Sequence, residues 1–362
     1  MKVSRPTTFA GLLVVGVLTL TACGTDDNGT AAGRSSIDCA TGDLKGAGST
    51  FQKNIVSEWI KSYGDACAEA SLDYQGIGSG AGIKQLGEGT IDFAGSDSTM
   101  KDDEQAAADA TCGSAAVHLP VTAGGIAVAY NLPGVKDLQL SPRTLAAIFQ
   151  GTVTKWDDAA VKADNPTASL PSTAVTAVHR DDSSGTTKVF SSFLAATAGA
   201  GWKLGADKEL SWPPRVQGAK GSDGVSQAVA AAEGGITYVE QSYVEGSTVL
   251  AAAKVQNAGG DYAALSADAV SEALADADTE VKGQDIRVKI DFTAVKGDAY
   301  PITAVSYEIV CSKGKDATKS ALLKSFLTYA VGDGQDSAED AGYAPLPGPL
   351  SAQVLTVVTA LR

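Results

Sequence analysis

The chain has 362 residues, 44% of them hydrophobic, which is enough to bury one large core or two ordinary ones. It carries 28 basic and 42 acidic side chains, a formal net charge of −14, with no cluster of Lys and Arg. Because binding to a nucleic-acid backbone needs clustered basic side chains, no nucleic-acid partner is expected. The sequence has only two histidines and no zinc-type cysteine spacing, so neither a metal nor a cofactor is expected.

Residues 1–22 have the pattern of a secretory signal peptide, in which a short basic region precedes an apolar run too short to span a bilayer. Residues 20–24 (LTACG) resemble the lipobox of bacterial lipoproteins, in which cleavage falls before the Cys and its thiol carries a diacylglyceryl group. The resemblance implies an extracytoplasmic protein anchored to the cell membrane by lipidated Cys23, with residues 23–36 as a flexible polar tether. An ordinary cleaved signal peptide is the alternative.

Three strands in the first third of the chain each lead through a Gly- and Ser-rich turn into a helix. We expect the strands at 44–47, 72–77 and 91–94 and the helices at 51–63, around 83–86 and at 101–110. This alternation predicts a doubly wound α/β layer. The three turns should then lie at one edge of the sheet, where such folds bind their ligands.

The rest of the chain continues the mixed pattern. The apolar stretch 117–130 is interrupted by residues 122–125 (TAGG), which predicts two strands joined by a crossover. Further elements are expected as a helix at 142–150, strands at 174–179 and 302–310, and helices that begin near Ser184, Asp223, 317 and 350. Residues 245–297 are Ala-rich and give no sharp signal.

Four cysteines remain after Cys23, at positions 39, 67, 112 and 311. An even number in a secreted chain predicts two disulfides, with three possible connectivities, and four free thiols are the alternative. Cys67 follows the first helix and Cys112 precedes the fourth strand, so both should lie at the sheet edge away from the ligand. We therefore favour the pairs Cys67–Cys112 and Cys39–Cys311.

Four short segments share Gly, Ser, Thr and a few charges just before a predicted helix. They are residues 48–51 (GSTF), 78–82 (GSGAG), 95–99 (GSDST) and 180–187 (RDDSSGTT). A helix N-terminus presents free N–H groups and positive dipole density, Gly lets an anion approach the backbone, and hydroxyls add donors. Each segment alone could be an ordinary helix cap. Four together, one of them with an Arg, indicate one shared anion.

These segments carry a resemblance to a known family. Residues 46–51, 74–86, 91–97 and 180–186 resemble, in this order, the signatures of the phosphate-binding subunits (PstS family) of bacterial phosphate ABC importers. Residues 154–158 (TKWDD), 300–302 (YPI) and 344–347 (APLP) also fit, so the resemblance covers essentially the whole mature chain.

The resemblance implies a two-lobed α/β fold of the type II periplasmic-binding-protein class, each lobe a central mixed sheet flanked by helices. One lobe would comprise 37–122 plus 298–362 and the other 123–297. The two would close by a hinge on inorganic phosphate in the cleft between them. A monomeric binding protein of this kind is not an enzyme, and it delivers phosphate to the membrane permease and ATPase subunits of the importer.

The family's site residues carry over one by one to this sequence. The phosphate-binding residues implied are Thr50, Phe51, Ser79, Asp97, Arg180, Ser184, Gly185 and Thr186, with Asp182 orienting the Arg. Arg180 would supply the charged fork, and Asp97 would be the one carboxylate touching the ligand. The family loop often reads Ser-Ser-Gly-Gly where this chain has residues 79–82 (SGAG), so no side-chain contact is expected from position 80.

Other interpretations remain open from the sequence. An extracellular phosphoesterase could use the same anion site, although no nucleophile elbow, Walker loop or Cys–His pair is present. A receptor for sulfate or another oxyanion is a second alternative. Asp97 could instead cap the following helix through residues 98 and 99, and His118 and His179 are expected to serve packing.

Overall fold

The computed structural model describes residues 37–362. The predicted signal peptide, the predicted lipidation site Cys23 and the predicted tether lie outside these residues. Within 37–362, no helix is both long and apolar enough to cross a membrane.

The described chain contains ten α-helices, four short 3-10 helices and fourteen strands. The α-helices are α1 (Lys53–Ala66), α2 (Ser79–Glu88), α3 (Asp102–Cys112), α4 (Pro142–Phe149), α5 (Ala159–Asp164), α6 (Gly185–Thr197), α7 (Gly221–Ala230), α8 (Ala267–Ala275), α9 (Ala317–Val331) and α10 (Gly348–Ala360). The strands are β1 (Gly42–Gly48), β2 (Ala70–Gly76), β3 (Phe93–Ser96), β4 (Ala116–Asn131), β5 (Gln139–Leu140), β6 (Thr176–Arg180), β7 (Gln217–Ala219), β8 (Gly235–Glu240), β9 (Ala251–Ala252), β10 (Lys254–Gln256), β11 (Tyr262–Ala263), β12 (Asp278–Lys282), β13 (Asp285–Lys289) and β14 (Thr303–Cys311). The 3-10 helices are η1 (Gly199–Gly201), η2 (Gln241–Tyr243), η3 (Asp333–Ser337) and η4 (Glu339–Ala341).

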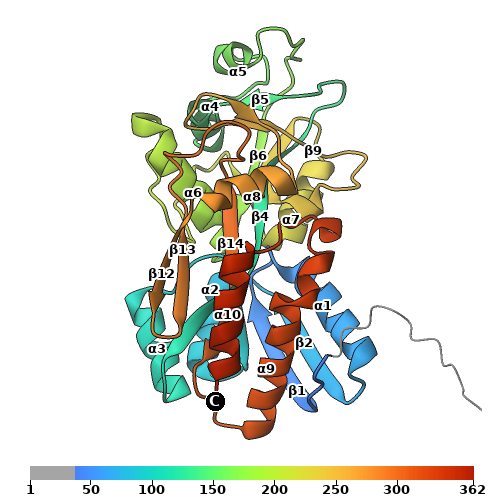
Figure 1. Ribbon diagram of the computed structural model, residues 1–362. Helices are drawn as coiled ribbons and strands as arrows, with labels where there is room; N and C mark the ends of the chain where they lie inside the picture. The colour runs from blue at the N-terminus through green and yellow to red at the C-terminus, as the bar shows by residue number, and fades with distance from the viewer. Residues whose placement is uncertain (1–36) are drawn as a thin grey trace, which may run out of the picture. The chain divides into compact units, whose positions relative to one another are not determined.

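One mixed sheet runs through both halves of the molecule, in the order β2-β1-β3-β14-β4-β8-β6-β7. β1, β2 and β3 are parallel, as are β6, β7 and β8, whereas β14 is antiparallel to both β3 and β4. In Figure 1, α1, α2, α3, α9 and α10 surround the first strands, while α4, α6 and α7 lie beside the second group. The predicted two-lobed α/β fold is therefore confirmed.

The residues at the ends of the helices explain where they start and stop. Ser141 caps α4 by accepting a hydrogen bond from the Thr144 amide, and a proline follows at the first helical position. Asp316 caps α9 in the same way. α2 ends at Gly89, whose φ of 72° places it in the left-handed region that glycine adopts without strain.

β4 corrects one expectation, because residues 116–131 form a single continuous strand without the crossover predicted at 122–125. The two glycines that suggested a break instead allow close packing. A Cβ on Gly124 would lie 3.0 Å from the ring of Phe51, and one on Gly125 would overlap the side chain of Leu265. β4 and β14 thus pass together from one lobe into the other (Figure 1).

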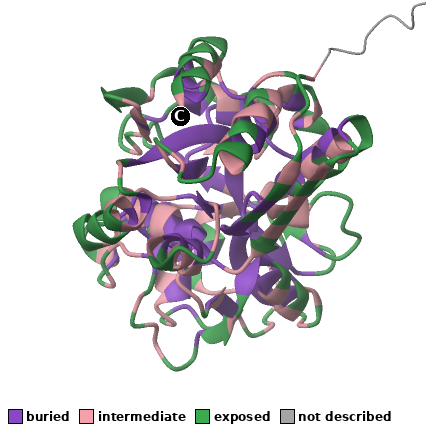
Figure 2. Cartoon of the chain, turned by 90° about the horizontal axis from the view of Figure 1, so that it is seen from below, coloured by how far each residue is buried: buried purple, intermediate pink, exposed green. Residues whose placement is uncertain are grey.

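The core lies on both faces of the sheet, as a doubly wound layer requires. On one face, Phe93 packs against Tyr74 and Phe326. On the other face, the next residue, Ala94, packs with Ile83 and Leu86 of α2. Figure 2 shows the buried residues concentrated on the interior strands, with exposed residues on the outer sides of the helices.

Residues 245–297, which gave no sharp signal, form the short strands β9 to β13 and α8. The hairpin β12–β13 reaches across to the first group of elements. There Asp285 accepts a hydrogen bond from the His118 amide at 2.7 Å, and Arg287 donates to Gln105 of α3 at 3.0 Å.

The prediction of two disulfides is confirmed, but the favoured pairing is wrong. The bonds join Cys39 to Cys67 and Cys112 to Cys311. The registers of the strands explain this, because Gly42 pairs with Ala70 and each of these residues follows a cysteine by three positions. Cys311 likewise pairs with Ala116, which lies four residues after Cys112.

The two disulfides should contribute unequally to stability. They close loops of 28 and 199 residues, for which the chain-entropy model gives about 3.5 and about 5 kcal/mol. Urea unfolding should therefore show a larger loss in the free energy of unfolding for Cys112→Ser/Cys311→Ser than for Cys39→Ser/Cys67→Ser. Peptide mapping of unreduced protein that joins Cys67 to Cys112, or the reverse order of stability losses, would contradict this assignment.

Candidate functional site

The first lobe contributes three turns to the site, each at the carboxyl end of a parallel strand. β1 leads into Ser49 and Thr50, β2 leads into Ser79 at the start of α2, and β3 leads into Asp97. Because β1 pairs in parallel with both β2 and β3, the three turns lie at one edge of the sheet. The predicted convergence of these turns is confirmed.

The second lobe contributes the end of β6 and the starts of two helices. β6 ends at Arg180, α6 begins at Gly185, and α7 begins at Gly221. Ser184 caps α6 by accepting a hydrogen bond from the Thr187 amide at 3.1 Å. Two helix N-termini, with the positive ends of their dipoles, therefore face the same region as the arginine.

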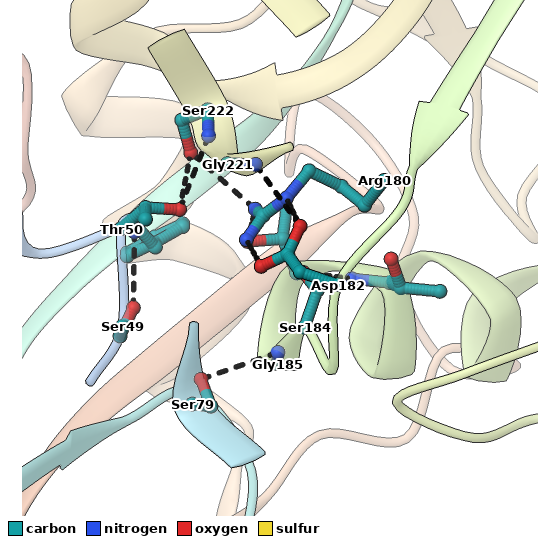
Figure 3. A network of polar contacts seen from close by, with 12 residues as sticks. Ser49, Thr50, Ser79, Arg180, Asp182, Ser184, Gly185, Gly221 and Ser222 are labelled. Atoms are coloured by element: carbon teal, nitrogen blue, oxygen red, sulfur yellow. Dashed lines mark hydrogen bonds and ion pairs between the residues drawn. The ribbon is translucent and has the colours of Figure 1, made fainter. Parts of the chain in front are cut away.

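Arg180 is held in place by a two-point contact with Asp182. Its Nε donates to Asp182 Oδ1 at 2.7 Å and its Nη2 donates to Oδ2 at 2.6 Å, and both side chains are buried. Nη1 lies 3.4 Å from Thr186 Oγ1. It lies at the same distance from Ser222 Oγ (Figure 3). One edge of the guanidinium is thus used for orientation, and the rest faces the hydroxyls of the site.

Hydrogen bonds between the lobes hold the site closed. Thr50 Oγ1 and Ser222 Oγ share one at 2.8 Å, and the Gly185 amide donates to Ser79 Oγ at 3.2 Å (Figure 3). A Cβ on Gly185 would lie 2.6 Å from Ser79 Oγ and 2.7 Å from Asp97 Oδ2. Only glycine at position 185 therefore allows this approach.

The two oxygens of Asp97 have different surroundings. Oδ1 accepts short hydrogen bonds from Ser49 at 2.5 Å and Ser306 at 2.7 Å. Oδ2 has only long contacts, at 3.4 Å to Ser79 Oγ and 3.5 Å to Thr186 Oγ1. Oδ2 is therefore the oxygen that a ligand can reach.

The charge of Asp97 is set by opposing influences. Burial raises the pKa of Asp97, while hydrogen bonds from Ser49 and Ser306 and the charge of Arg180 lower it. The alternative role of Asp97 as a helix cap is not seen, because α3 begins only at Asp102, after Lys101.

Two of the predicted residues already use some of the groups expected to bind the ligand. The Ser184 amide donates to the Lys208 carbonyl at 3.0 Å, so it already has a partner within its own lobe. The Phe51 amide donates to Ser49 Oγ at 3.0 Å, and its ring packs edge-on against Tyr343.

Four residues at the site were not given a role from the sequence. They are Ser49, Gly221, Ser222 and Ser306. The Gly-Ser pair at 221–222, at the start of α7, has a composition similar to that of the four selected segments and could have been found. Ser306 lies within an apolar strand and had no such signal.

Neither histidine takes part in the site. His118 is buried, and its Nε2 accepts from the Met100 amide at 3.0 Å while Nδ1 contacts Asp285 at 2.7 Å. His179 stacks on Trp212 with ring centres 4.9 Å apart. Within residues 37–362, no three His, Cys, Asp or Glu side chains are arranged to hold a metal ion.

Comparisons with known proteins agree with this geometry. A family model described as a PBP superfamily domain matches residues 33–333. The chain is 38% identical over 370 residues to the phosphate-binding protein PstS 3 of Mycobacterium tuberculosis and 35% identical over 373 residues to PstS 2 of the same species, with full coverage of both chains in each case.

A solved structure with the same fold is a high affinity periplasmic phosphate-binding protein (PfluDING) bound with phosphate at pH 8.5. It superimposes with a TM-score of 0.72 at 23% identity, over 87% of this chain and 93% of its own. The chain belongs to the PBP superfamily and, within it, to the PstS family of phosphate-binding proteins, as its motifs indicated.

Proposed function

We propose that this protein captures inorganic phosphate between its two lobes and binds it without chemical conversion. The observation that supports this most is the convergence of one buried guanidinium, Arg180, with hydroxyls from both lobes and the N-termini of α6 and α7. Such donors suit a small, dehydrated oxyanion. Thr50, Phe51, Ser79, Gly185 and Thr186 would donate to it.

The carboxylate in this site favours an oxyanion that carries a proton. An ionised Asp can only accept hydrogen bonds. Phosphate at neutral pH always retains at least one O–H, which Asp97 Oδ2 could accept, whereas sulfate has none. Asp97 would therefore select phosphate over sulfate.

Capture would be the first step of import. We propose that the lobes comprise 37–122 plus 298–362 and 123–297, and that they close about β4 and β14 when phosphate binds. The closed form would deliver phosphate to the permease and ATPase subunits of an ABC importer. Lipidated Cys23 would hold the protein at the outer face of the cell membrane.

Arg180→Ala should weaken phosphate binding at least tenfold, because losing one partner of a desolvated ion pair costs about 2–5 kcal/mol. Calorimetric titration would measure the change, with thermal unfolding as a check of folding. Arg143→Ala, which removes an exposed arginine, is the matched control.

The buried Asp182 would be left without its partner in Arg180→Ala, and this could disturb the site by itself. The double variant Arg180→Ala/Asp182→Ala removes both charges and separates the two effects. If the folded double variant binds phosphate as tightly as the unaltered protein, Arg180 is not the principal contact.

Asp97→Asn keeps the shape of the side chain but removes its charge and supplies an amide donor. We expect it to bind sulfate better than the unaltered protein does, which would narrow the phosphate-to-sulfate affinity ratio by at least about tenfold. A site that requires the ligand's proton can discriminate by about 10⁴–10⁵-fold, so there is ample range to observe this. Competition binding with Asp102→Asn, an exposed carboxylate at the start of α3, is the control. An unchanged phosphate-to-sulfate affinity ratio in Asp97→Asn would show that Asp97 does not select between the two anions.

A further inference from the structure

Two buried side chains, Ser306 and Gln52, connect Asp97 to a second buried carboxyl group, Glu308 on β14. Asp97 Oδ1 lies 2.7 Å from Ser306 Oγ, and Ser306 Oγ lies 2.6 Å from the side-chain oxygen of Gln52. The side-chain nitrogen of Gln52 lies 2.6 Å from Glu308 Oε1. The two carboxyl groups are therefore linked through one hydroxyl and one amide.

The sheet leaves room for this link at one glycine. A Cβ on Gly95 of β3 would overlap both the Gln52 amide and the hydroxyl of Tyr74. The Tyr74 hydroxyl accepts from Gln52 at 3.2 Å and donates to the Ser49 carbonyl at 2.9 Å. The amide of Gln52 thus contacts Tyr74 in addition to Ser306 and Glu308.

The number of protons in the link follows from the donors available. The Ser306 hydroxyl has one proton, but its oxygen contacts two acceptors, Asp97 and the Gln52 oxygen. If Ser306 donates to Gln52, its contact with Asp97 is a hydrogen bond only when Asp97 is protonated and donates to Ser306.

A half-turn of the Gln52 amide exchanges its oxygen and nitrogen, and the need for a proton then falls on Glu308 instead of Asp97. The Tyr74 hydroxyl must then donate to the Gln52 oxygen in place of the Ser49 carbonyl. Ser306 then accepts from Gln52 and donates to Asp97. The Gln52 oxygen now meets Glu308 Oε1, and that contact requires a proton on Glu308. In both arrangements, Asp97 and Glu308 together hold one proton.

The surroundings of the two carboxyl groups indicate which one holds it. Burial raises the pKa of Asp97, but hydroxyl donors and the charge of Arg180 oppose this rise and favour its anion. Within residues 37–362, Glu308 Oε2 is buried without a hydrogen-bond partner. Burial and the nearby charge of Asp97 raise the pKa of Glu308 well above its usual range, and the other titratable group facing it, Tyr74, stays neutral because burial raises its pKa too.

We propose that Glu308 is a neutral carboxylic acid that holds the single proton shared with Asp97 and thereby keeps Asp97 ionised toward the cleft. Glu308 is a positioning residue in this proposal, since it acts on the ligand only through Asp97. The inference rests on the proposed role of Asp97 as acceptor of the ligand's proton. It adds that Glu308, on β14, maintains the negative charge that Asp97 needs for this role.

Infrared spectroscopy of protein with ¹³C-labelled glutamate carboxyl groups tests this at pH 7, because protonated and ionised carboxyl groups absorb separately. Glu240 is also fully buried, and burial raises its pKa well above the usual range. In Glu240→Gln, a protonated glutamate signal should therefore remain, and it should disappear in Glu240→Gln/Glu308→Gln. In Glu308→Gln alone, one glutamic-acid equivalent should be lost, so either single variant that folds decides the question.

The proposal is overturned if folded Glu240→Gln shows no protonated glutamate, or if Glu308→Gln leaves the signal unchanged. Stability gives a second readout. Because the folded protein holds the Glu308 proton more tightly than the unfolded chain does, stability should fall as pH rises from the ordinary glutamate pKa toward the raised one. Glu308→Gln should remove this part of the slope, and an unchanged slope would count against the proposal.

These outcomes are distinct from a failure of the proposed function. If the unaltered protein does not bind phosphate, the function fails whatever the glutamate signal shows. If phosphate binds and the signal is absent, only the role of Glu308 fails.

Discussion

The buried ion pair of Arg180 and Asp182 is the interaction on which the site depends. A guanidinium removed from water is tolerated only when its N–H groups are paired. Asp182 pairs with two of them and also accepts from the Gly221 amide at 3.0 Å, so the same carboxylate positions the arginine and the start of α7. The hydroxyls of Thr186 and Ser222 then surround the remaining donors. A single cation placed in this way serves an anion site in a chain whose net charge is −14.

The exposed ion pairs between the lobes contribute little to holding them together. Lys53–Asp223 and Lys101–Asp207, each at 2.8 Å, are largely exposed ion pairs, a type that contributes about 0–1 kcal/mol. Lys208–Glu104, at 2.6 Å, is more buried. Because these ion pairs contribute little to closure, most of the free energy that favours the closed form over the open form would come from the ligand. This arrangement suits a protein whose closure reports that the site is filled.

Much of this could be predicted from the sequence because the site is built from local motifs. Strand, Gly-Ser turn and helix follow one another directly, so Ser79 and Arg180 could be placed by their neighbours alone. Features that depend on contacts between residues far apart in the sequence were not predicted or were predicted wrongly. The disulfide partners follow from the register of β1 with β2 and of β4 with β14, and the glycines in β4 reflect packing against Phe51 and Leu265. Glu308 and Ser306 lie more than 200 residues from Asp97 and Gln52, in a strand that reads as apolar core.

The central claim is that the cleft binds an oxyanion that carries a proton, and that it does so by enclosure. Parallel calorimetric titrations of phosphate and sulfate into ligand-stripped, unaltered protein at neutral pH test this most directly. The account predicts one phosphate per chain, with sulfate bound about 10⁴-fold more weakly or not at all. Sulfate that binds at concentrations similar to phosphate, or phosphate that fails to bind, would contradict it.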